Sequence, residues 1–373
     1  MSRYFATVAR GLESVAAAEL TSLGAQHVKP DFAGVQFTGD RPLLYRVNLC
    51  ARTIFRVLVP IAEFRCRNAR ELYRSIQAID WREHLLPDQT LAIDCTGGNR
   101  QLNHTHFTAL QVKNAIVDQQ RQQAGRRSSV DPQSPDLRLN LHIYKQRGTL
   151  SLDSSGRSLH RRGYRAAMGQ APLKETLAAA LIQLTGWQGD VPLYDPLCGS
   201  GTFPLEAALI ARRMAPGRFR KDFGFERWRN FEPQIWAAVQ AAAQEQELAT
   251  LPVPIVGSDR DPEMLQQARA NARNAELDNQ VRWHQAELST VEAPSEPGIL
   301  LCNPPYGHRI GIAEELGPFY KLLGDVLKQR FTGWTAYILT TKVLSKCVGL
   351  QATQRIPVYN GALACTLLKY ELY

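Results

Sequence analysis

The sequence predicts an α/β protein: a mostly parallel sheet with an antiparallel edge strand forms its C-terminal half, and an α+β region precedes it. Two observations support this prediction. From residue 191 onward, short apolar runs that end in Asp, Glu or Asn alternate with segments of helical periodicity, which is typical of parallel strands joined by helices. The last pattern is a hairpin, with residues 354–358 and 364–371 flanking a turn at 359–361, and it predicts antiparallel pairing at one edge.

Charge divides the chain into two unlike halves. Residues 1–170 contain 24 Lys and Arg against 14 Asp and Glu, whereas residues 171–373 contain 20 against 21. The basic half indicates a polyanionic partner, and the near-neutral half indicates ligand chemistry of another kind. At 373 residues and 44% hydrophobic content, the chain can fill two or three cores.

Neither a membrane span nor a secretion signal is visible in the sequence. No apolar run reaches the roughly 18 residues of a membrane-spanning helix, and the N-terminus lacks an apolar signal core. The seven cysteines include no Cys-x-x-Cys pair, so we expect neither a zinc site nor disulfides. These features predict a cytoplasmic protein with reduced cysteines.

The N-terminal half alternates between strand and helix periodicity. Helices are expected from Glu13 to about Leu23, over 41–49, from about Ala69, and over 107–121. Strands are expected over 4–9, 35–38, 53–61, 91–95, 137–144 and 149–153. His104 and His106 have no carboxylate or cysteine at metal-ligand spacing, so a loop role is favoured over metal binding.

Residues 155–165 form the densest positive stretch and join the two halves. Arginines can bind phosphate groups and a tyrosine can stack on a base, so this stretch is a candidate RNA contact. Its candidate RNA-binding residues are Arg157, Arg161, Arg162, Tyr164 and Arg165. A solvated linker is the alternative interpretation.

A glycine-rich loop, residues 196–202, follows a strand expected over 191–194 that closes on Asp195. Helices are expected before it, over 173–184 behind Pro172, and after it, over 203–214. The loop lacks both the Gly-Lys-Ser/Thr ending of a phosphate loop and dinucleotide glycine spacing. Asp195 disfavours a pyrophosphate, so a ligand with an ammonium group and no phosphate, S-adenosylmethionine, fits better. The candidate cofactor-binding residues here are Asp195, Cys198, Gly199, Ser200, Gly201 and Thr202.

Two further carboxylates follow later strands. Asp259 ends a strand over 255–258, where it can accept both ribose hydroxyls. Asp261 before Pro262 is expected to cap the next helix. Glu287 follows a strand expected over 281–286 and can accept a bond from the adenine amine, with a surface role as the alternative. A helix over 319–327 and a strand over 335–340 complete the pattern.

The motif Leu301-Cys302-Asn303-Pro304-Pro305-Tyr306-Gly307 ends a strand expected over 298–302. Two prolines stiffen the chain where open α/β sheets bind ligands. The Asn303 side-chain oxygen and the Pro304 carbonyl can accept both N–H bonds of an exocyclic amine, and Tyr306 can stack on the ring. Asn303, Pro304 and Tyr306 are therefore the candidate catalytic residues, and Asn303 also borders the cofactor. The motif alone leaves guanine, adenine, cytosine or glutamine amide open as acceptor, and a Pro-rich turn is the structural alternative.

The chain resembles, over nearly its whole length, the bacterial 23S rRNA guanine-N2 methyltransferases that carry a THUMP domain. The residues that carry the resemblance are 9–13, 43–49, 150–156, 159–165, 195–202 and 303–307. The resemblance implies a ferredoxin-like segment (1–60), a THUMP RNA-binding domain (61–158) and a class I, Rossmann-like methyltransferase domain (159–373).

The resemblance also implies transfer of a methyl group from S-adenosylmethionine to the N2 amine of a guanine in 23S rRNA, free or in a precursor particle. By position, Asp195, Gly199, Gly201, Asp259 and Glu287 correspond to cofactor-binding residues, and Asn303, Pro304 and Tyr306 to residues that hold the target base. Glu287 replaces the Asp usual in relatives. Some relatives continue into a second methyltransferase half, whereas this chain stops at Tyr373, so no second activity is expected.

The sequence leaves two alternative functions open. One is a tRNA guanine-N2 methyltransferase, because THUMP domains also serve tRNA. The other is a non-catalytic RNA-binding or ribosome-assembly protein that retains the pocket. Methylation of DNA or of a protein glutamine would leave the basic N-terminal half unexplained.

Overall fold

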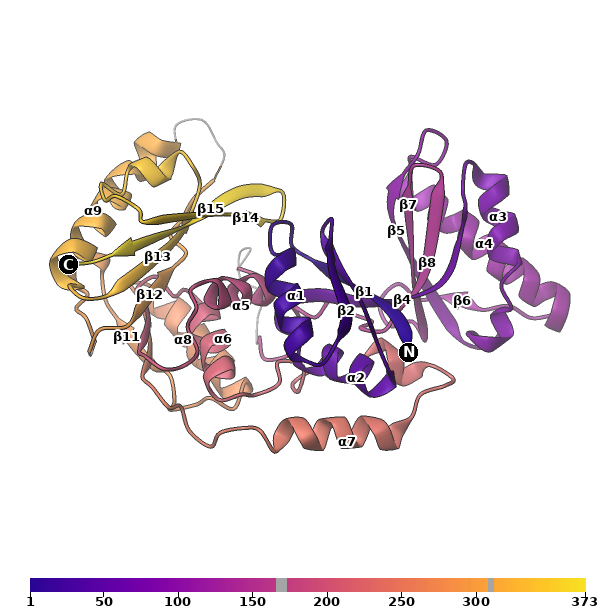
Figure 1. Ribbon diagram of the computed structural model, residues 1–373, viewed down its shortest axis with the longest axis horizontal. Coiled ribbons are helices and arrows are strands. Elements are labelled where there is room, and N and C mark those ends of the chain that lie inside the picture. The colour runs from indigo at the N-terminus through magenta and orange to yellow at the C-terminus, as the bar shows by residue number, and fades with distance from the viewer. Residues whose placement is uncertain (166–172, 295, 308–311) are drawn as a thin grey trace.

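The computed structural model describes residues 1–165, 173–294, 296–307 and 312–373, and its strands form two sheets (Figure 1). The first sheet has eight strands in the order β2-β3-β1-β4-β8-β7-β5-β6, and the second has seven in the order β11-β10-β9-β12-β13-β15-β14. Within the described residues, no helix combines the length and apolar character that crossing a membrane requires.

The elements of the first half are β1 (Ser2–Val8), α1 (Glu13–Ser22), β2 (Gln26–Asp31), β3 (Gly34–Gly39), α2 (Arg41–Cys50), β4 (Ile54–Arg65), α3 (Ala69–Gln77), η1 (Trp81–Glu83), β5 (Thr90–Gly98), α4 (Thr105–Ala124), β6 (Ser129–Val130), β7 (Leu137–Tyr144) and β8 (Arg147–Asp153). The expected strands and helices of this half are confirmed, and β2 and β6 were not expected. His104 caps α4, because its ring accepts a bond from the Phe107 N–H.

The elements of the second half are α5 (Glu175–Leu184), β9 (Leu193–Asp195), α6 (Thr202–Ala211), η2 (Gly224–Arg227), α7 (Pro233–Gln244), β10 (Ile255–Asp259), α8 (Pro262–Asn274), β11 (Arg282–Gln285), η3 (Leu288–Thr290), β12 (Ile299–Cys302), α9 (Ile312–Arg330), β13 (Thr335–Thr340), η4 (Leu344–Lys346), β14 (Gln354–Asn360) and β15 (Leu363–Glu371). Pro172, expected to open α5, lies outside the described residues. Asp261 caps α8 as predicted, since its carboxylate accepts from the Glu263 and Met264 N–H groups.

The second sheet has the predicted class I methyltransferase architecture. Strands β11, β10, β9, β12 and β13 are parallel, and the β14–β15 hairpin adds antiparallel pairing against β13. Apolar residues of α5 and α6 pack in a core on one side, and those of α9 pack in a second core with Tyr194 and Leu300. Burial on both faces explains the apolar character of the central strands β9, β12 and β13, whereas the edge strand β11 is polar and mostly exposed.

The first sheet runs without interruption through the proposed division at residue 60. Strand β4 pairs with β1 through Ile54–Leu58 and with β8 through Leu58–Arg65. Its register against β8 shifts between Pro60 and Ala62, where the proline has no N–H to donate. The ferredoxin-like and THUMP segments therefore share one sheet.

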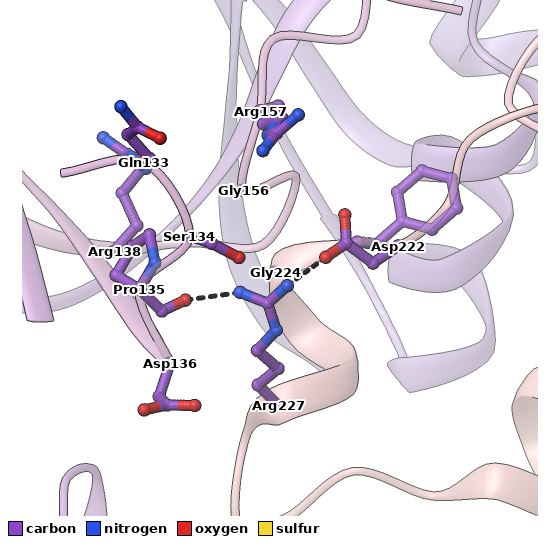
Figure 2. Close-up of a pocket in the computed structure, with 11 residues that line it drawn as sticks. Gln133, Ser134, Pro135, Asp136, Arg138, Gly156, Arg157, Asp222, Gly224 and Arg227 are labelled. Atoms are coloured by element: carbon purple, nitrogen blue, oxygen red, sulfur yellow. Dashed lines mark hydrogen bonds and ion pairs between the residues drawn. The ribbon is translucent and has the colours of Figure 1, made fainter. Parts of the chain in front are cut away.

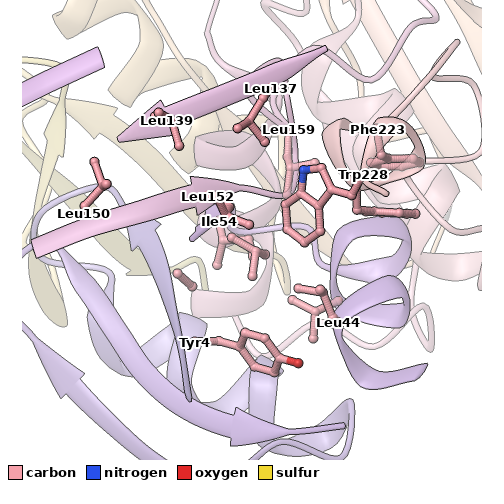
Figure 3. Packing of buried hydrophobic residues seen from close by; sticks show 14 of the residues in the cluster. Tyr4, Leu44, Ile54, Leu137, Leu139, Leu150, Leu152, Leu159, Phe223 and Trp228 are labelled. Atoms are coloured by element: carbon pink, nitrogen blue, oxygen red, sulfur yellow. The ribbon is translucent and has the colours of Figure 1, made fainter. Parts of the chain in front are cut away.

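Residues 212–250, between α6 and β10, reach back onto the first half. Phe223, Phe225, Trp228 and Trp236 are buried in the same core as residues of β1, α2 and β4 (Figure 3). The Phe225 ring stacks on Tyr45 with centroids 4.4 Å apart, and α7 packs against α2 (Figure 1). This segment, for which the sequence predicted no structure, completes the N-terminal core.

A buried ion pair lies where the two halves meet. The side chains of Arg162 and Glu206 are 1% and 0% exposed, and the Arg162 Nη2 lies 3.1 Å from Glu206 Oε2. Arg162 also donates to the carbonyls of Leu159 and Arg52, and Tyr164 donates to Glu206 at 3.0 Å. Burial opposes the charge on Arg162, but the Glu206 carboxylate outweighs it and raises the pKa of Arg162 above its usual value.

We expect Glu206→Gln to lower the free energy of unfolding by about 3–5 kcal/mol, because it leaves the buried Arg162 guanidinium without a counter-charge. Urea denaturation followed by circular dichroism measures the loss. Arg3→Ala is the control, because it removes the exposed Arg3–Glu63 ion pair, whose side chains are 76% and 43% exposed. An exposed pair contributes little to stability. Equal losses in the two variants would contradict a stabilising role for the buried pair.

Candidate functional site

The carboxyl ends of three neighbouring strands bring the predicted site residues to one edge of the second sheet. Strand β9 pairs with β10 through Asp195 and Gly257, and on its other side with β12 through Tyr194 and Leu300. The chain order reverses at β9, and open α/β sheets bind ligands at such a switch point. Asp195, Asp259 and Asn303 each end or follow one of these strands.

The glycine-rich loop folds over the end of β10. Gly199 N–H donates to Asp259 Oδ2 at 2.9 Å, and Cys198 N–H donates to the Ser258 carbonyl at 2.9 Å. Asp259 also accepts from the Asp261 N–H at 3.0 Å. Asp259 therefore shapes the loop, and its oxygens keep lone pairs that hydroxyl groups of a ligand could use.

The two loop glycines are needed for different reasons. Both have positive φ, +51° at Gly199 and +85° at Gly201. A Cβ on Gly201 would lie 2.6 Å from the Trp283 ring, whereas a Cβ on Gly199 would meet no described atom within 4 Å. Gly201 thus permits close packing against β11, and Gly199 faces open space where a ligand can approach the backbone.

Asp195 is a buried carboxylate with few partners. It is 2% exposed, and its Oδ1 accepts one bond from the Leu197 N–H at 3.0 Å. Burial raises the pKa of Asp195 well above its usual value, and the nearby Asp259 carboxylate adds to the rise. A cationic group beside Asp195 would offset both effects. The Asp195 carboxylate therefore fits an ammonium-bearing ligand and disfavours a phosphate.

The cysteines of the site have a packing role. Cys198 is 7% exposed, and its Sγ would lie 3.1 Å from a Cβ on Gly257. Burial raises the pKa of the Cys198 and Cys302 thiols, with Asp195 adding to both. A protonated, enclosed thiol is a poor nucleophile. Cys198 can contribute to ligand binding through its backbone alone.

Asn303 presents an acceptor with no hydrogen-bond partner. Its Oδ1 is buried, and no donor among the described residues reaches it. A buried acceptor left without a donor costs about 1–3 kcal/mol, so such an atom usually has a ligand or water as its partner. It follows a buried strand at the switch point, which is where a substrate amine would be held.

Hydrogen bonds from neighbouring elements hold the segment that follows Asn303, residues 304–306. Tyr320 OH donates to the Pro305 carbonyl at 3.2 Å and accepts from Thr340 Oγ1 at 2.7 Å. Tyr306 is half-buried, and its OH accepts from Asn360 Nδ2 at 3.1 Å. Asn360 was expected only as a turn residue, and its contact with Tyr306 was not predicted.

Arg165 was assigned to RNA, and the structure corrects that prediction. Its side chain is only 13% exposed and pairs with Glu175 at 2.8 Å. Its guanidinium also donates to Ser200 Oγ and Thr202 Oγ1, at 3.1 and 3.2 Å. Arg165 therefore holds the glycine-rich loop, and Ser200 and Thr202 use their hydroxyls as its acceptors.

Two further RNA predictions are wrong for the same reason. Arg162 and Tyr164 are 2% and 1% exposed and belong to the ion-pair network of Glu206. An RNA chain cannot reach them in this conformation. The sequence pattern that suggested RNA contact, several arginines with one aromatic residue, occurs in buried ion-pair networks as well as on RNA-binding surfaces.

Arg157 and Arg161 remain candidates for RNA contact because both are exposed. Arg157 lines a small pocket with a cavity volume of about 20 Å³, whose other lining residues are Gln133, Ser134, Pro135, Asp136, Arg138, Gly156, Asp222, Phe223, Gly224 and Arg227. Figure 2 shows Arg157 near Gly156 and Arg227 between the Pro135 carbonyl and Asp222. Glu287, the candidate adenine partner, is exposed at the start of η3, where its side chain makes no cap bond.

Comparisons with known proteins agree with this architecture. Residues 162–369 match the family model described as the RMKL-like methyltransferase domain, 66–153 match the THUMP domain, and 3–58 match the RlmL ferredoxin-like domain.

Three relatives illustrate the similarity. A Synechocystis protein provisionally named RNA methyltransferase slr0064 is 57% identical, over 99% of this chain and 97% of its own length. The ribosomal RNA large subunit methyltransferase K/L of Syntrophotalea carbinolica is 42% identical over 99% of this chain. The crystal structure of SMU.472, provisionally titled a methyltransferase complexed with SAH, is 31% identical, with a TM-score of 0.87 over 100% of this chain and 98% of that one. This chain spans about half, 53%, of the K/L relative.

Alanine at the two loop glycines should separate ligand binding from folding. We expect Gly199→Ala to weaken S-adenosylhomocysteine binding at least about tenfold, because the new methyl group fills space left open for the ligand. Its cost in stability should be only the roughly 1–2 kcal/mol of an alanine at positive φ, since the methyl group meets no described atom. Gly201→Ala should lower the free energy of unfolding by about 2–4 kcal/mol, since it adds a clash to an unfavourable φ. Calorimetric titration and urea denaturation measure the two effects. The reverse pattern would contradict the roles assigned to these glycines.

Proposed function

Because the chain belongs to the RMKL-like methyltransferase family, we propose that it transfers a methyl group from S-adenosylmethionine to the exocyclic N2 amine of a guanine in 23S rRNA. The single observation that carries this proposal is the buried, unpartnered Oδ1 of Asn303 at the switch point, judged among the described residues. The names of the K/L relatives support large-subunit rRNA as the substrate. An rRNA substrate implies action in the cytoplasm.

The proposed cofactor site uses the chemistry of the sheet edge. S-adenosylmethionine supplies a methyl group already activated on a sulfonium. Asp195 would interact with its positive charge, and Asp259 would accept its ribose hydroxyls. The backbone from Cys198 to Thr202, where a Cβ on Gly199 would meet no described atom, would border the ligand, and Glu287 would accept from the adenine amine.

The proposed target site holds the nitrogen with uncharged acceptors. Asn303 Oδ1 and the Pro304 carbonyl would each accept one N–H of the guanine amine, which orients its lone pair toward the methyl carbon. Tyr306, with its hydroxyl fixed by Asn360, would stack on a guanine flipped out of its RNA. The reaction would gain mainly from this alignment, an effect worth up to about 7–11 kcal/mol in model reactions. The amine proton would leave to solvent after transfer.

The RNA itself would bind the basic first half. Its excess of Lys and Arg over acidic residues suits the phosphate backbone, and Arg157 and Arg161 are exposed where this half joins the methyltransferase domain. A tRNA substrate remains the second candidate, since a THUMP domain alone does not choose between the two RNAs.

We expect Asn303→Ala to reduce kcat for methylation of 23S rRNA by about 100-fold or more, because the amine loses an acceptor that aligns it. Affinity for S-adenosylhomocysteine should change by less than about threefold. Asn230→Ala, at an exposed asparagine, is the matched control and should keep full activity. Normal turnover by Asn303→Ala would reject the proposed role of Asn303.

The substrate is tested by incubating the protein with tritiated S-adenosylmethionine and separated 23S rRNA and tRNA. Label in a guanine N2 of 23S rRNA supports the proposal. Label in tRNA alone would replace it with the second candidate, and label in neither RNA, free or in ribosomal precursor particles, would contradict both.

A further inference from the structure

Three planar side chains, two exposed and one half-buried, form a stack at the β14–β15 hairpin, which also contacts Tyr306. The Arg10 guanidinium lies 5.6 Å from the centre of the Phe32 ring and 4.8 Å from the centre of the Tyr359 ring. Arg10 and Phe32 belong to the first half, whereas Tyr359 belongs to β14 of the second sheet. We call these three residues the Phe32–Arg10–Tyr359 stack.

The turn that carries Phe32 is held in a fixed conformation. One Glu13 oxygen accepts from the Ala33 N–H at 3.1 Å, and the other accepts from the Gly11 N–H at 2.8 Å. The Ala33 carbonyl accepts from the Val8 N–H at 3.0 Å. These bonds fix the 9–13 loop and the β2–β3 turn against each other, so the stack is preorganised.

The same segment of β14 contacts both the stack and the target site. Asn360, which follows Tyr359, donates to Tyr306 OH at 3.1 Å. On the other side, a Cβ on Gly11 would lie 3.3 Å from the Pro357 carbonyl and 3.7 Å from the Tyr359 ring. Adjacent residues of β14 therefore link the stack to the Tyr306 hydroxyl.

Charge and exposure indicate the class of partner. Phe32 is 75% exposed and Arg10 is exposed. Within the described residues, no carboxylate forms an ion pair with Arg10. An exposed aromatic ring beside an unneutralised guanidinium suits a strand whose bases are unstacked and whose backbone is anionic.

We infer that the Phe32–Arg10–Tyr359 stack binds nucleotides that flank the target guanine, with a base on Phe32 and a phosphate on Arg10. This inference extends the proposed function: the ferredoxin-like segment contributes directly to the substrate site and does more than support the THUMP domain. A contact that merely clamps the two halves would not need Phe32, whose ring is mostly in solvent.

The first test is the methylation of transcribed 23S rRNA by variants of the full chain. Phe32→Ala should raise KM roughly tenfold with kcat and S-adenosylhomocysteine affinity unchanged within about twofold, because a stacking partner of the RNA is lost. Phe32→Tyr should restore KM. Tyr373→Ala, at a fully exposed aromatic, is the matched control and should leave KM unchanged. An unchanged KM in Phe32→Ala, with wild-type activity present, would overturn the inference and leave the proposed function intact.

The contribution of Arg10 is tested by salt dependence. Arg10→Ala should weaken RNA binding and reduce the slope of log affinity against log salt by about one, as expected for one phosphate contact. Glu63→Gln, elsewhere on the first sheet, should leave affinity near the wild-type value. An unchanged slope in Arg10→Ala would contradict the phosphate contact.

A second readout does not depend on turnover. A photoreactive benzoylphenylalanine at position 32 should crosslink to 23S rRNA within a few nucleotides of the methylated guanine. If the wild-type protein labels tRNA instead, the same measurement on tRNA decides the inference. Absence of crosslinks to any RNA that the protein binds would overturn it, even if the protein proves not to methylate RNA.

Discussion

The buried Arg162–Glu206 pair fixes the geometry on which the other parts depend. Glu206 lies in α6, the helix that begins directly after the glycine-rich loop, and Arg162 binds the carbonyl of Arg52 from the first half. Arg52 in turn donates to the carbonyls of Leu209, in the last turn of the same helix, and of Met214, just after the helix ends. Because a buried charge has little freedom to move from its partner, the basic first half and the glycine-rich loop are held in one arrangement.

The segment that contains Arg162 also fixes the glycine-rich loop. Arg165, three residues after Arg162, holds the hydroxyls of Ser200 and Thr202, so one short segment supports both the interface and the loop. On the opposite side of the sheet, the β14–β15 hairpin touches Arg10 and Tyr306 through adjacent residues. The first half thus contacts the second sheet in two separate places, at Arg162 and at the β14–β15 hairpin.

Local sequence was sufficient for much of this arrangement. The strand ending in Asn303 and the loop after Asp195 are encoded by neighbouring residues, and both form where the pattern predicted. Strand β2 was missed because its side chains are mostly exposed, so it lacks an apolar alternation. Arg162 and Tyr164 were misassigned because their partner, Glu206, is 44 and 42 residues away. Neither burial nor pairing over such a distance is visible in a local pattern.

The segment that carries Phe225 and Trp236 has a consequence for how the molecule is made. Ribosomal synthesis delivers the first sheet well before residues 223–239, yet those residues fill its hydrophobic interior beside Tyr45. The nascent first half is therefore an incomplete folding unit, because the apolar surface around Tyr45 is covered by α7, which begins 80 residues after the last strand of the first sheet ends. Neither half could be exchanged for a foreign domain without exposing apolar side chains of the other, because residues of both fill one core.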